Sequence, residues 1–66
     1  MKMFRIRRHS GREGGAWREI PTPQDRDKAM RKYHNLRANM RQGGVEFWQQ
    51  GVLVLQAWAP RLRTRW

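Results

Sequence analysis

The chain has 66 residues, with 15 Lys and Arg against five Asp and Glu, which gives a formal net charge of +10. This length accommodates one small domain and excludes a two-domain enzyme with a cleft between its domains. Because the sequence has no cysteine, it excludes disulfides, a thiolate nucleophile and a cysteine zinc site. We therefore expect a single basic domain over residues 1–66 that depends on its apolar core or on an oligomer interface.

No stretch of the sequence approaches the roughly 20 apolar residues of a membrane span, and Met1–Arg8 lacks the apolar block of a signal peptide. The sequence thus predicts a cytoplasmic protein with no membrane partner. Twelve of the 15 cationic residues are arginine. The guanidinium group binds phosphate through two parallel hydrogen bonds and stacks on flat rings. This bias favours nucleic acid as the partner, although a GC-rich genome would raise the arginine content in the same way.

The first third of the chain predicts a β-hairpin. Lys2–His9 alternates, with Phe4 and Ile6 on one side and basic residues on the other, which is typical of a half-buried strand. Ser10–Gly15 is rich in glycine and has no apolar side chain, so it predicts a hairpin loop. A second strand is expected over Ala16–Ile20.

A helix is expected next. Thr22 offers a capping hydroxyl, Pro23 suits the first helical position, and Asp25 faces the positive helix end, so we predict that the helix begins at Pro23. Its apolar residues recur at steps of four, three and four: Ala29, Tyr33, Leu36 and Met40. Gly43 and Gly44 are expected to end a helix of about five turns.

A second hairpin is predicted after the helix. Val45–Gln50 alternates, with Val45 and Phe47 on one side, and a turn at residues 50–51 leads into Val52–Trp58. The run Val52–Leu55 is apolar throughout, so it should be covered on both faces, either at the centre of the sheet or by a partner chain. The second possibility favours a homodimer.

These elements predict the α+β class, with an antiparallel sheet of four to five strands and one helix packed on one face, in the order β-β-α-β-β. Residues 60–66 begin with Pro60 and form either a fifth strand or a basic arm. The alternative is a chain that orders only on binding, because its charge is high for so few apolar residues.

The sequence shows no grouping of residues that supports catalysis. Candidate groups such as Ser10, His9 and Tyr33 are scattered, and His34 has no second His or acid four residues away on its helical face. The glycine-rich loop lacks the spacing of a phosphate-binding P-loop and is not followed by a helix. We therefore predict a protein without enzymatic activity, metal or cofactor.

The strand faces indicate a nucleic-acid surface instead. Arg5 and Arg7 point away from the expected core, and Trp17 and Trp48 join them on the open face of the sheet if Ile20 faces the helix. Bases can stack on such rings while phosphates meet arginine. Alternatively, the tryptophans pack across strands or fill a dimer interface.

Two further basic segments can contact phosphates. The tail is the densest, and its alternating arginines form a candidate arm: Arg61, Arg63 and Arg65. One helix flank gathers five polar residues that are either simply solvated or docked along a phosphate backbone: Lys28, Arg31, Lys32, Asn35 and Asn39.

We therefore expect a small basic protein that binds DNA or RNA, mainly through phosphates, with stacking as a second contribution and little sequence specificity. The alternative is a protein-binding inhibitor or adaptor that docks on an acidic or nucleic-acid-binding site of a larger complex. No family motif is present. In size, basicity and economy of elements the chain resembles the small proteins that phages and mobile elements encode against host machinery, anti-CRISPR proteins among them. That resemblance implies no site residue.

Overall fold

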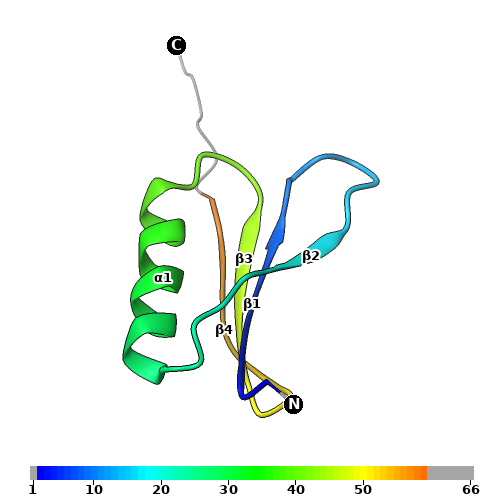
Figure 1. Cartoon of the computed structure of the whole chain (residues 1–66). Coiled ribbons are helices and arrows are strands. Elements are labelled where there is room, and N and C mark those ends of the chain that lie inside the picture. Colours follow the sequence, from blue (N-terminus) through cyan, green and yellow to red (C-terminus); the bar gives the residue numbers. More distant parts are fainter. Residues whose placement is uncertain (1, 60–66) are drawn as a thin grey trace.

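The structure is a computed structural model that describes residues 2–59. Its elements are β1 (Phe4–His9), β2 (Trp17–Ile20), α1 (Arg26–Asn39), β3 (Gly44–Gln49) and β4 (Val52–Trp58). The strands form one four-stranded antiparallel sheet in the order β2-β1-β3-β4, and α1 packs against one of its faces (Figure 1). The predicted α+β class and order of elements are confirmed. The predicted fifth strand or arm at 60–66 lies outside the described residues.

The core lies between α1 and the two central strands, where apolar side chains alternate with polar ones. Ile6 on β1 pairs with Phe47 on β3, and both side chains are fully buried beneath the helix. Tyr33 packs its ring against Phe47 with 5.9 Å between centroids. Burial raises the pKa of the Tyr33 hydroxyl, while the nearby Arg37 charge acts in the opposite direction. The buried apolar residues are Phe4, Ile6, Ala29, Tyr33, Met40, Val45 and Phe47.

Three of the four residues in the predicted helix stripe are buried. Ala29, Tyr33 and Met40 belong to the core, whereas Leu36 is only partly buried at its border. The helix begins later than expected, because the carboxylate of Asp25 caps it by accepting hydrogen bonds from the first-turn backbone. The prediction of a Thr22 cap and a start at Pro23 is wrong.

Thr22 and Gln24 instead complete the hydrogen bonding of β1 where β2 has ended. The Thr22 hydroxyl accepts from the Ile6 amide at 3.0 Å, and the Gln24 side-chain oxygen accepts from the Phe4 amide at 3.1 Å and the Met3 amide at 2.8 Å. The Gln24 amide group also donates to the Phe4 carbonyl at 2.9 Å. These backbone groups would otherwise lack partners beside a buried core, which explains why Thr22 serves the sheet and not the helix.

The helix ends at Asn39 with Met40 as its C-cap, before the glycines that were expected to stop it. Gly43 has a different function. Its φ of +88° is left-handed, and a Cβ atom there would overlap the carbonyl oxygen of His9. A Cβ atom on Gly11 would in turn lie 2.7 Å from the Gly43 amide nitrogen. The loop after α1 and the loop after β1 therefore cross with backbone against backbone.

The second hairpin follows the prediction, with a turn in which Gln50 (φ 51°) and Gly51 (φ 76°) are both left-handed. However, β4 is an edge strand of the sheet that the described residues form. Of the two predicted placements of Val52–Leu55, the one at the centre of the sheet is therefore not found there. One helix covers β1 and β3, and Val52, Leu53 and Val54 remain 61%, 40% and 48% exposed. Within this run only Leu55 packs against the core, and Ala57 further along β4 does so as well.

The loop crossing makes Gly43 a test of the fold. Gly14→Ala serves as the control, because Gly14 is also left-handed (φ +78°) but has no atom within 4 Å of a built Cβ. Gly14→Ala should cost about 1–2 kcal/mol of the free energy of unfolding through its backbone conformation alone. Gly43→Ala should cost at least roughly twice as much, since the His9 carbonyl must also move. Equal midpoints in urea denaturation of the two variants would contradict the crossing.

Because the β4 edge is uncovered among the described residues, a homodimer that pairs through β4 stays a prediction. An uncharged, apolar edge strand is prone to pair with another strand. Light scattering over a concentration range should give a mass near twice 8.0 kDa at high concentration. Val54→Lys should shift the mass towards the monomer, because a lysine on an edge strand disfavours pairing with another strand. A mass of one chain at every concentration would exclude the dimer.

Candidate nucleic-acid interface

The face of the sheet opposite α1 carries all the predicted site residues that the structure describes. Arg5 pairs with Trp48, and His9 pairs with Trp17, so these side chains share the open face with Arg7. The placement follows the strand alternation that predicted it. The tail arginines of the prediction lie outside the described residues: Arg61, Arg63 and Arg65.

The centre of this face is a buried carboxylate. Glu46 is only 6% exposed, and it accepts hydrogen bonds from the Trp48 indole nitrogen at 2.9 Å and the Gln56 amide nitrogen at 3.0 Å. An Arg7 guanidinium nitrogen lies 3.9 Å from the same carboxylate. The Arg7 guanidinium also sits 5.8 Å from the centre of the Trp48 ring. Glu46 thus orients both Trp48 and Arg7.

A second carboxylate, that of Glu19, pairs with Arg5. Glu19 on β2 lies 3.9 Å from an Arg5 guanidinium nitrogen and 3.4 Å from the Lys2 ammonium. These pairs are largely exposed and contribute little stability. They nevertheless supply negative charge next to Arg5, so the open face is less positive than its arginines suggest.

An aromatic cluster occupies the end of the open face nearest the β1–β2 loop. The rings of His9, Trp17 and Trp58 meet edge to face, with centroids 5.3 to 5.7 Å apart. Gly44 lies beneath Trp58, where a Cβ atom would come within 2.9 Å of the ring. Trp17 therefore packs across strands, which is one of the three uses expected for it. Trp58 remains 55% exposed.

Sequence reasoning did not identify His9 and Trp58 as part of this cluster. The signal lies in the register, in which His9, Gly44 and Trp58 stand side by side on β1, β3 and β4. A small residue between two aromatic ones allows their rings to meet.

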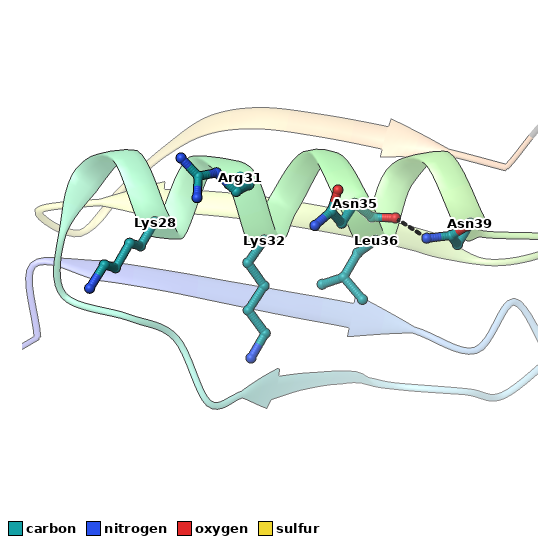
Figure 2. A pocket seen from close by; sticks show the side chains of 6 residues that line it. All are labelled: Lys28, Arg31, Lys32, Asn35, Leu36 and Asn39. Atoms are coloured by element: carbon teal, nitrogen blue, oxygen red, sulfur yellow. Dashed lines mark hydrogen bonds between the residues drawn. The ribbon is translucent and has the colours of Figure 1, made fainter.

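The polar flank of α1, for which the sequence left open a solvated face or docking along a phosphate backbone, lines a shallow hollow of about 320 Å³. Figure 2 shows its lysine side chains extending from the helix, with Leu36 beside them. Lys32 donates a hydrogen bond to the Pro21 carbonyl, and Asn39 donates to the Asn35 carbonyl at 2.9 Å. No carboxylate lines this hollow. Its lining residues are Lys28, Arg31, Lys32, Asn35, Leu36 and Asn39.

A larger hollow of about 880 Å³ lies at the β1–β2 hairpin. Arg8 and Arg18 line it, and they stand directly opposite each other on the two strands. Both are on the same face of the sheet as Ile6 and Ile20, the face that α1 occupies further along. Sequence reasoning missed this pair, which emerges only once Ile6 is aligned with Ile20.

The ion pairs of the described residues are all located on the open face, and each joins a cation to Glu19 or Glu46. Asp25 and Asp27 stand at the start of α1. The cations without a carboxylate within 4 Å, among residues 2–59, lie on α1, on its following loop or on the β1–β2 hairpin: Arg8, Arg12, Arg18, Arg26, Lys28, Arg31, Lys32, Arg37 and Arg41. Unneutralised positive charge is therefore concentrated away from the open face.

Other kinds of site find no support in the described part of the chain. Within residues 2–59, no three His, Asp or Glu side chains gather closely enough to hold a metal ion. In the same range, no helix has the length and apolar character to cross a membrane. No protein family model, curated protein or solved structure matches this chain.

From the contacts of Glu46 we expect that replacing this residue lowers the free energy of unfolding. Glu46→Gln would replace one accepting oxygen by an amide donor that faces a donor of Trp48 or Gln56. We expect a loss of about 1–3 kcal/mol in the free energy of unfolding, since a buried polar group is left without its partner. Glu13→Gln, on the exposed hairpin loop, is the charge-matched control and should change stability little. Denaturant titration gives the free energy of unfolding of both variants. Equal stability would show that Glu46 does not organise this face.

Proposed function

We propose that this protein is a non-enzymatic nucleic-acid-binding protein that contacts DNA or RNA mainly through phosphates and reads little sequence. The observation that supports the proposal is the segregation of charge. Carboxylates pair with cations on the open face of the sheet, whereas the cations of α1 have no such partners within the described residues. The same holds for Arg8, Arg12 and Arg18 of the β1–β2 hairpin, which lie off the open face. A surface of this kind attracts a polyanion and releases its counterions on contact.

The composition strengthens this argument. The chain carries a net charge of +10 on 66 residues, and self-repulsion of that size opposes the compact state. A bound phosphate backbone removes that repulsion. Since most of the cations are arginine, each can bind phosphate with two parallel hydrogen bonds.

The open face supplies a second kind of contact. Trp17 and Trp48 are half-buried there, and Arg5 and Arg7 lie beside Trp48. Partly exposed rings can stack with bases of a single strand without sequence preference. The proposal therefore keeps these four residues as contacts, and it keeps the tail arginines as a basic arm.

A second candidate function is a protein-binding inhibitor, of the kind that phages encode against host complexes. The specific observation in its favour is the β4 edge, where Val52, Leu53 and Val54 are exposed with no charged residue in the strand. An exposed edge strand can add to the sheet of another protein.

Binding over a salt series separates the two functions. Fluorescence anisotropy with labelled duplex DNA, single-stranded DNA and RNA should show affinity that falls steeply with salt, with a log-log slope of about −0.9 per duplex phosphate contacted. Replacing Arg61, Arg63 and Arg65 together by Gln should flatten the slope by up to about three units. If the parent protein binds none of the three at low salt, the inhibitor takes first place. If the triple variant binds like the parent at every salt concentration, the tail is not a phosphate arm.

A further inference from the structure

Two arginines face each other across the β1–β2 ladder. Arg8 and Arg18 are direct cross-strand partners, and both side chains are exposed. Like charges at directly opposed positions of an antiparallel pair destabilise it. Neither guanidinium has a carboxylate within 4 Å among the described residues. The hairpin thus carries a repulsive contact that an anion between the two groups would turn into an attractive one.

The pair lies where the helix does not cover the sheet. In Figure 1, α1 packs along one side, while the β1–β2 hairpin extends away from it on the other. Arg12 on the loop lines the same hollow, as do Ser10 and Gln42. Glu13 is the one carboxylate of the lining, so three guanidinium groups face a single negative charge there.

Contacts to the rest of the fold hold the start of the β1–β2 loop in position. The Gln42 side-chain amide donates to the Ser10 carbonyl at 2.8 Å, and Gly11 crosses the backbone of Gly43. Within the loop, the Gly15 amide donates to the Arg12 carbonyl at 2.9 Å. The loop that lines the hollow is therefore held by the loop after α1 as well as by the sheet. This lowers the entropy cost of ordering the loop when a ligand binds.

We propose that Arg8 and Arg18 form a phosphate clamp, in which two guanidinium forks hold one backbone phosphate of a bound nucleic acid, with Arg12 reaching a neighbouring phosphate. The inference deepens the proposed function and rests on it. The ligand chemistry is a phosphodiester, because guanidinium matches its oxygens bidentately. The large, open hollow suits a chain of phosphates more than an enclosed small molecule.

The test compares two double variants of equal charge loss. Arg8→Gln with Arg18→Gln removes the clamp, and Arg26→Gln with Arg37→Gln removes two exposed charges of α1 that line neither hollow. With a labelled duplex, the clamp variant should flatten the log-log salt slope by about 0.9 units, because its two guanidinium groups hold one phosphate. The loss of affinity between 50 and 200 mM salt would then shrink by roughly 3.5-fold. The control should shift the slope by less than half of that.

Two further measurements keep the outcomes separate. The clamp variant should melt no lower than the parent, because it removes like-charge repulsion, so weaker binding would not reflect unfolding. In ¹⁵N NMR spectra of the parent, the Nε–H signals of Arg8 and Arg18 should shift on addition of the duplex and change far less with inorganic pyrophosphate. Equal slopes for the two double variants would overturn the clamp while leaving nucleic-acid binding intact.

Failure of the proposed function has a different signature. If the parent binds no nucleic acid but pyrophosphate shifts both arginine signals strongly, the hollow takes a small phosphate compound and the backbone proposal is overturned. If the parent binds nucleic acid without shifting these signals, only the clamp is overturned. If the parent binds no nucleic acid and neither ligand shifts the signals, both proposals are overturned.

Discussion

A single helix can cover only one face of the sheet, and the organisation of this small protein follows from that constraint. Beneath α1 the central strands present Ile6 and Phe47, and the core is fully apolar there. Among residues 2–59 nothing covers the opposite face as a second layer, and polar and aromatic contacts join its strands there. Glu46 binds the side chains of Trp48 and Gln56 across β3 and β4, and the His9 cluster closes one end. A buried carboxylate with satisfied hydrogen bonds thus holds the strands together on the open face, as apolar packing does on the face under α1.

This arrangement also decides where the charge is neutralised. Glu19 and Glu46 both point to the open face, where they meet Arg5 and Arg7. The remaining acids are at the helix start or in the hairpin loop, and a carboxylate near a helix N-terminus is stabilised by the helix dipole. Positive charge is left in excess around α1 and the hairpin. The core has to be covered by α1 on one face of the sheet. The cations without a carboxylate partner are therefore most numerous on that side of the molecule.

Strand alternation and helical periodicity predicted the class, the order of elements and the faces of the residues assigned on β1, β2 and β3. Arg5, Arg7, Trp17 and Trp48 share the open face because alternation is a local property of extended chain. The errors concern non-local needs. Thr22 has the right chemistry for a cap, but the amide of Ile6, 16 residues away, requires its hydroxyl. The Arg8 and Arg18 pair depends on strand register, which the loop composition alone does not fix.

The strand that ends at Trp58 has a consequence for how distant parts of the chain act together. Trp58 is anchored on Gly44 and His9, and the Ala59 amide donates to the Gly43 carbonyl at 2.8 Å. β4 therefore ends at the same end of the sheet as the β1–β2 loop. Under the proposed function, a strand held at this loop would be presented to the exposed Trp58 ring at high effective concentration. Short anionic fragments that reach only one of these two places would lose this linkage, so the length of a bound strand, and not only its charge, would set the strength of the association.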